Sequence, residues 1–197
     1  MARQRVYAEA THLWLVMPLE DEDRPRRPLA EGLHLLRGAG EVDLALTAQV
    51  GATPEHQLAR FSTEGGTPWM ILDGDVPLFS CWTFPRRIPT IAGPGGWLEG
   101  PEGAMFLEDS VTTEAARGRG IAPAAWSSIG DALAEDGVRQ LFTPVNPENI
   151  PVRRALEKVG FVEVARTVTT RRGRTNVAVE VLRPEGEWMA LNVARRS

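Results

Sequence analysis

Cysteine, lysine and tyrosine each occur once in these 197 residues, as Cys81, Lys158 and Tyr7. A single cysteine excludes an internal disulfide and suits a reducing compartment, so we expect a cytoplasmic protein. The three histidines are scattered without the spacing of a metal site, and we expect no metal cofactor. The 22 basic residues comprise 21 arginines and one lysine, a bias that we attribute to coding composition.

Long hydrophobic runs and an excess of positive charge are also missing. The apolar run at 12–19 is too short to span a bilayer, and no secretory leader is recognisable, so we expect no membrane association. The net charge of −4 argues against a nucleic-acid partner. The remaining composition is that of an ordinary globular protein, and the length suits one domain, spanning 1–197, with a sizeable core.

Apolar runs separated by glycine- and proline-rich turns predict an alternation of strands and helices. Asp73-Gly74-Asp75 between two apolar runs indicates a hairpin. Thr53 before Pro54 is typical of a helix start, with the threonine as cap. The charged segment 20–28 reads as a solvated loop without a function, and 85–103 as a loop or irregular crossover. We predict strands at 12–17, 69–72, 76–84, 104–112, 138–145, 161–170 and 175–183, and helices from 53, 123 and 149.

The segment Arg117-Gly118-Arg119-Gly120-Ile121-Ala122-Pro123 lies between a predicted strand and a predicted helix. A glycine-bearing turn at a helix N-terminus directs unpaired backbone N–H groups to one point, where the helix dipole adds positive potential. Arginine side chains bind phosphate oxygens in forked geometry. The segment therefore indicates a phosphate or pyrophosphate site, although its glycines would also serve a purely structural turn.

Two common phosphate loops do not fit this segment. A Walker A loop needs Lys-Ser/Thr after its second glycine, where Ile121-Ala122 stand, and the dinucleotide fingerprint needs a third glycine, where Pro123 stands. The pattern R-x-x-G-x-A does fit, at Arg117, Gly120 and Ala122. In this setting it resembles the acyl-CoA loop of the GNAT superfamily of N-acyltransferases.

A second segment, 149–161, resembles the other GNAT signature: an asparagine, a helix, and Gly-Phe opening a strand. Asn149 is a good N-cap, Pro151 is tolerated in the first helical turn, and Gly160 suits the left-handed C-terminal position. One face of this helix is apolar, at Val152, Ala155, Leu156 and Val159. The resemblance is clear over 104–170.

The resemblance implies the GNAT version of an α/β fold. This is a mixed, twisted central sheet with helices on both faces and a splayed pair of parallel strands, here 104–112 and 138–145. The pantetheine arm of acetyl-CoA, or of another acyl-CoA, would lie in the splay, with Val111 and Thr112 competing for one role. The implied cofactor-binding residues are Ser110, Val111, Thr112, Arg117, Gly118, Arg119, Gly120, Ile121, Ala122 and Asn149.

The implied reaction is acyl transfer to a primary amine of a small molecule or amino acid, which needs a base and a proton for the thiolate. Glu108 and Asp109 are candidate bases, and both would also serve structurally. Successive strand residues face opposite ways, so one at most should face the substrate directly. We favour Glu108, which reaches further and shares its side with Ser110. Many relatives carry a tyrosine acid where Leu156 stands.

Two other functions remain open. Trp82 and Trp97 flank the segment where GNAT acceptors bind, and they would either hold a longer acyl chain or pack in the core. The missing tyrosine also permits a catalytically weak, CoA-binding regulator. The acceptor is unspecified, and a homodimer is left open.

Overall fold

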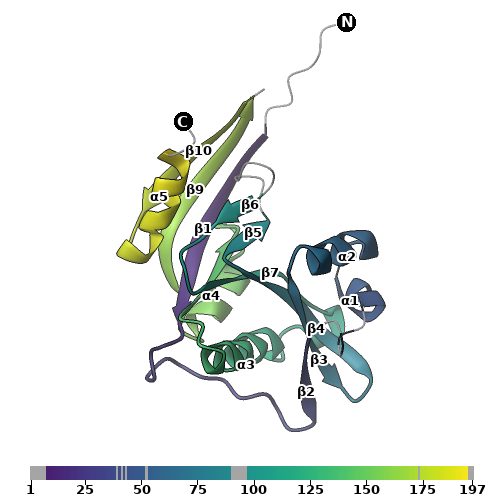
Figure 1. The fold of residues 1–197 in the computed structure, drawn as a ribbon. Helices are drawn as coiled ribbons and strands as arrows, with labels where there is room; N and C mark the ends of the chain where they lie inside the picture. The colour runs from purple at the N-terminus through teal and green to yellow at the C-terminus, as the bar shows by residue number, and fades with distance from the viewer. Residues whose placement is uncertain are drawn as a thin grey trace, which may run out of the picture.

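The computed structural model describes residues 8–194 except 39, 41, 43, 52, 90–96 and 173. Its centre is an eight-stranded sheet in the order β10-β9-β1-β8-β7-β4-β3-β2 (Figure 1). Strands β7 and β8 are parallel, and the other neighbours pair antiparallel. The strands are β1 (Ala8–Pro18), β2 (Leu33–Arg37), β3 (Thr67–Asp73), β4 (Val76–Pro85), β7 (Ala104–Thr112), β8 (Gln140–Val145), β9 (Val162–Arg172) and β10 (Arg174–Val181).

Helices cover both faces of this sheet, as the sequence predicts. Strand β1 divides its side chains between two apolar clusters: Leu13 and Leu15 join one, and Trp14 and Val16 join the other. This alternation is expected of a strand buried on both faces. The first cluster includes side chains of α3 (Ile121–Glu135) and α4 (Ile150–Glu157), and the second those of α1 (Leu44–Val50), α2 (Glu55–Thr63) and α5 (Glu187–Ala194). The predicted fold class is confirmed.

The predicted elements that matter for the site are present. The strand at 104–112 has the predicted bounds, and the turn at Gly74-Asp75 joins β3 to β4. The pairing of these strands is irregular next to Pro77, which fits a residue without an N–H donor. Asn149 caps α4 by accepting a hydrogen bond from the Val152 N–H, at 3.4 Å.

Other parts of the chain differ from the prediction. The predicted loop at 85–103 contains a two-stranded sheet, β5 (Arg87–Pro89) and β6 (Trp97–Glu99), because Ile88 and Leu98 bury their side chains in the second cluster. Strand β2 and helices α1 and α5 were not predicted. Strand β8 begins at Gln140 rather than at 138. Gly173, between β9 and β10 in the chain, lies outside the described residues.

The predicted cap of the second helix is wrong. Helix α2 begins at Glu55 with Pro54 as its N-cap, and no side chain caps it. The Thr53 hydroxyl instead donates a hydrogen bond to the Asp109 carboxylate, at 2.8 Å. The Thr53 hydroxyl therefore bonds to a residue far along the chain instead of capping the helix that follows it.

Candidate active site

The parallel strands β7 and β8 separate partway along their length. They pair at Ala104, Met105 and Phe106, although β7 continues to Thr112 and β8 to Val145. Just past the last pair, the Thr143 hydroxyl donates a hydrogen bond to the Leu107 carbonyl, at 3.1 Å. Beyond it the facing edge of β7 is released from β8. The splayed parallel pair that the resemblance implies is present.

Strand β7 carries a β-bulge beside this opening. In its pairing with β4, Trp82 lies opposite Glu108 and Ser80 lies opposite Val111, so Cys81 faces two residues of β7, Asp109 and Ser110. Asp109 has a φ of 52°, a left-handed conformation that non-glycine residues adopt infrequently. Bulges of this kind redirect side chains at functional sites.

The bulge changes how the two candidate bases are placed. Strict alternation would put Glu108 and Asp109 on opposite faces of β7. In the structure both line one cavity of about 190 Å³, because the extra residue and its left-handed φ interrupt the alternation. The expectation that one of them at most faces the site is therefore wrong. The cavity is also lined by Ser110, Trp126, Thr143, Pro144, Val145, Asn146, Asn149, Val152 and Leu156.

Both carboxyl groups are harder to ionise than usual. Burial raises the pKa of Glu108 to about 8; the charge of Asp109 adds to this, and a 3.2 Å hydrogen bond from the Asp109 N–H partly offsets it. Burial also raises the pKa of Asp109, against the hydrogen bond from Thr53. Glu108 therefore gains or loses its proton near neutral pH, as a general base should.

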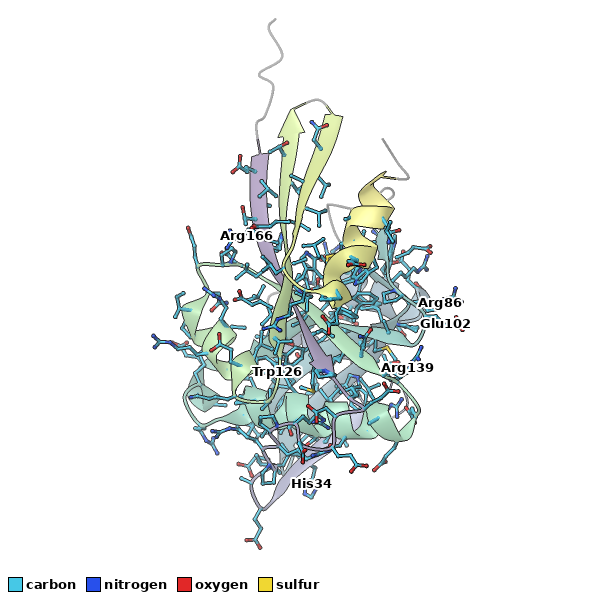
Figure 2. The ribbon with its side chains drawn as sticks, turned by 90° about the vertical axis from the view of Figure 1, so that its left-hand side faces the viewer. His34, Arg86, Glu102, Trp126, Arg139 and Arg166 are labelled. Carbon is cyan, nitrogen blue, oxygen red and sulfur yellow. The ribbon has the colours of Figure 1, made fainter. Side chains whose placement is uncertain are left out.

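A larger groove, of about 870 Å³, adjoins this cavity. It shares four lining residues with the cavity: Ser110, Trp126, Asn149 and Val152. All ten residues that the resemblance implies for the cofactor line it, from Ser110–Thr112 and 117–122 to Asn149. The indole N–H of Trp126, which Figure 2 labels on α3, donates to the Ser110 hydroxyl at 3.2 Å where the two spaces meet.

The glycine turn has the backbone that its sequence predicts. Gly118 and Gly120 have φ of 76° and 78°, and Gly120 is the N-cap of α3. This left-handed backbone favours glycine, and a Cβ atom at either position would lie in open space. No side chain caps the helix. The first N–H groups of α3, which no helical carbonyl accepts, are therefore at the wall of the groove.

Leu156 lies at the cavity wall and is 1% exposed. A tyrosine at this position would place a hydroxyl in the same cavity as Glu108, but leucine has no hydroxyl. The chain's one tyrosine, Tyr7, lies outside the described residues.

The two tryptophans proposed for a longer acyl chain are placed differently. Trp82 is fully buried and stacks with Phe84, at 6.4 Å between ring centroids. Trp97 contacts the edge of the same ring and lies under the guanidinium of Arg87. Neither is among the described residues that line the groove or the cavity. Both tryptophans pack with the second apolar cluster, which was the alternative prediction.

Of the groove residues that sequence analysis missed, two are charged, Arg27 and Lys158. Arg27 belongs to the segment 20–28, which was given no function. Its backbone N–H donates to the Ser127 hydroxyl of α3 at 3.0 Å, which brings the segment to the groove. Nothing in the local pattern of that segment signals this contact. Lys158 follows α4 as the single lysine, and its rarity is the one available signal.

No protein-family model and no curated protein matches this sequence. Solved structures do. The GCN5-related N-acetyltransferase from Sphaerobacter thermophilus matches with a TM-score of 0.60 and 16% identity, over 92% of this chain and 55% of that chain. A GNAT-family acetyltransferase from Colwellia psychrerythraea matches with a TM-score of 0.56 and 12% identity, over 84% and 56% of the two chains.

A third solved structure contains a ligand related to CoA. It is AAC(6′)-Iy in complex with the bisubstrate analogue CoA-S-monomethyl-acetylneamine, with a TM-score of 0.51 and 16% identity, over 66% of this chain and 91% of that chain. These matches show that the chain has the GNAT fold, as the two motifs indicated. The chain spans little more than half the length of the Sphaerobacter and Colwellia chains.

Two further observations concern the described residues alone. None of their helices is both long and apolar enough to cross a membrane. No three of their histidine, cysteine, aspartate or glutamate side chains come together in a group that could hold a metal ion.

Proposed function

We propose that this protein is an acyl-CoA-dependent N-acyltransferase that transfers an acetyl group to a primary amine of a small molecule or amino acid. One observation carries the proposal: the groove at the α3 N-terminus and the cavity of Glu108 and Asp109 meet at the splayed edge of β7. A cofactor bound along the groove would bring its far end to a carboxylate. The GNAT fold supports the same assignment.

The turn at 117–122 would bind the pyrophosphate of the acyl-CoA. Its backbone N–H groups and the α3 dipole favour an anion there, and Arg117 and Arg119 add charge. The pantetheine arm would follow Ser110, Val111 and Thr112 along the edge of β7 that β8 leaves free. Asn149 would border the arm from the start of α4.

Glu108 would remove a proton from the amine. A free alkylamine has a pKa of ~10.4 and is mostly protonated near neutral pH, so a base must make its lone pair available. The amine nitrogen then attacks the thioester carbonyl carbon, and backbone N–H groups of the freed β7 edge stabilise the oxyanion. The C–S bond breaks, the nitrogen releases its second proton, and the departing CoA thiolate takes up a proton, directly or through water, to leave as the thiol. One carboxylate oxygen of each residue accepts a hydrogen bond, from the Asp109 N–H in Glu108 and from the Thr53 hydroxyl in Asp109. We assign the role to Glu108 because its pKa, raised to about 8, suits proton transfer near neutral pH.

The cavity supports a small, cationic acceptor and a short acyl group. It holds two carboxyl groups and no arginine or lysine among its described lining residues, which favours an ammonium group over an anion. Its volume of about 190 Å³ suits an acetyl group and an amine better than a long acyl chain. The Trp82 side chain is fully buried, so it does not support the long-chain alternative.

A CoA-binding regulator with weak catalysis remains the second candidate, and buried Leu156 in place of an acid is the observation that favours it. Thiol release from acetyl-CoA, measured across a library of primary amines, separates the two. Turnover of a cationic amine supports the enzyme. Tight acetyl-CoA binding without turnover of any amine would support the regulator, and no CoA binding would contradict both.

We propose a cytoplasmic location, which the single, buried cysteine suits. We also propose one domain over 1–197, which the continuous eight-stranded sheet supports. We propose a small-molecule amine as its partner, with no nucleic acid, membrane or metal. The net charge and the scattered histidines support this view.

The pH dependence of kcat/KM should report Glu108. With a pKa of about 8, its carboxylate forms as the pH rises, so kcat/KM should increase with pH and level off above that value.

The same raised pKa should make the folded protein less stable as the pH rises. The native state retains the Glu108 proton above the ordinary pKa, so the free energy of unfolding should fall as the pH rises toward 8.

Both profiles can be measured on one pair of proteins, the wild type and Glu108→Gln. The variant should lose the levelling-off near pH 8, because residual activity without the base depends on the neutral amine, which keeps increasing toward the amine pKa of ~10.4. Its free energy of unfolding should fall less with pH. A wild-type kcat/KM that is flat between about pH 6 and about pH 9 would contradict the role of Glu108.

Leu156→Tyr tests whether the site needs an acid. A thiol has a pKa of ~8.5, so protonating the leaving thiolate is only mildly demanding near neutral pH. We therefore expect kcat to rise by less than about tenfold, or not at all if water already serves. Leu156→Phe, which adds the ring without the hydroxyl, is the matched control. Equal kinetics and equal loss of stability in both variants would show that residue 156 is core alone.

A further inference from the structure

The groove is more positive than the chain that forms it. Four basic residues line it, Arg27, Arg117, Arg119 and Lys158, and no carboxylate is among its described lining residues. The whole chain carries 26 acidic and 22 basic residues. A cleft lined by one sign of charge concentrates potential and attracts a polyanion.

The four cations come from different parts of the fold. Arg117 and Arg119 belong to the glycine turn, and Arg119 lies 4.0 Å from the Asp73 carboxylate. Arg27 and Lys158 lie outside the turn, in the segment after β1 and directly after α4. Both are exposed, and neither forms an ion pair within the described part of the chain. Their charges are free for a ligand.

Several contacts hold the Arg27 segment against α3 and the end of α4. The Arg27 N–H donates to Ser127, and the buried side chain of Arg24 pairs with Asp131. Pro25 packs on Gly160, where a Cβ atom would lie 3.2 Å from the proline Cδ. Arg27 is two positions after Pro25 and Lys158 two before Gly160, so both cations are close in the chain to this contact, and both line the groove.

We propose that Arg27 and Lys158 bind the ribose 3′-phosphate of CoA, at a site separate from the turn that binds the pyrophosphate. This inference rests on the proposed function. CoA carries a pyrophosphate and a phosphate monoester, and a monoester has about −1.5 to −2 charges near neutral pH, enough for two cations. An arginine offers forked donors and a lysine a compact charge. The pair would select CoA over its 3′-dephospho form.

Calorimetric titration of the full chain with CoA and with dephospho-CoA tests this selection. We expect the wild type to bind CoA at least about tenfold more tightly, with a smaller ratio at high salt. Arg27→Gln and Lys158→Gln should each weaken CoA binding by about three- to tenfold and leave dephospho-CoA binding unchanged. The double variant should bring the ratio of the two affinities near one.

Arg154→Gln is the matched control, because Arg154 is exposed on α4 and does not line the groove. It should keep the wild-type ratio. Equal wild-type affinity for the two ligands would overturn the phosphate site while the proposed function stands. Variants that lose affinity equally for CoA and for dephospho-CoA would also overturn the phosphate site. Failure of the wild type to bind either ligand would overturn the proposed function, and this inference with it.

Discussion

Glu108→Gln should lower kcat by about 10²–10⁴-fold and leave acetyl-CoA affinity within about twofold of wild type. The glutamine keeps the size of the side chain but cannot accept the proton of the amine. Glu108 lines the small cavity and not the groove, so cofactor binding should not depend on it. Its raised pKa, about 8, comes chiefly from burial, and removing an ionisable group there should not unfold the protein.

Asp109→Asn is the matched comparison for Glu108→Gln. Asp109 lines the same cavity, but its carboxylate accepts the Thr53 hydroxyl and its pKa is raised as well. We expect a smaller loss of kcat in this variant. If Asp109→Asn loses more turnover than Glu108→Gln at equal stability, the base is Asp109 and our assignment is wrong. Single-turnover rates and calorimetry separate the chemical step from binding.

Gly120→Val should weaken acetyl-CoA binding at least about tenfold, because the pyrophosphate would lose backbone contacts to a charged oxygen worth about 1.5–3 kcal/mol each. Gly120 has a φ of 78°, which a β-branched residue strongly disfavours, so the turn must rearrange to accept valine. A Cβ atom there meets no other atom within 4 Å. The damage should therefore lie in the shape of the turn and its approach to the ligand, not in core packing.

Gly137→Val separates the loss of binding from the loss of stability. Gly137 follows the other end of α3 with a φ of 80°, and its Cβ atom would also lie in open space. It does not line the groove. Both variants should lose stability by a similar amount, of order 1–2 kcal/mol or more, measured by denaturant unfolding. Only Gly120→Val should lose acetyl-CoA affinity; equal affinities in two folded variants would remove the turn from the site.

The parts of the site that sequence analysis predicted are encoded locally. The strand at 104–112, the turn at Gly118 and Gly120, and the capped helix after Asn149 each depend on residues close together in the chain. The hydrophobic period, the glycine conformations and the asparagine cap therefore sufficed to place them. The ten cofactor candidates come from these segments, which explains why they line one groove.

The parts that were missed depend on partners far along the chain. The bulge at Asp109 exists because β4 aligns Cys81 against two residues of β7, and nothing in the sequence near Asp109 sets that register. The Thr53 hydroxyl bonds to Asp109, 56 positions away, instead of capping the helix. Arg27 reaches the groove through Ser127, 100 positions away. Local sequence propensity cannot predict such long-range contacts, although these contacts determine the finer geometry of the site.

A crystal structure of the protein with acetyl-CoA tests the central claim most directly. We expect the pyrophosphate on the N–H groups of the turn at 117–122 and the pantetheine arm along 110–112. The thioester should lie in the splay between β7 and β8, beside the Glu108 carboxylate. Acetyl-CoA bound elsewhere, or with its thioester far from Glu108, would contradict the account.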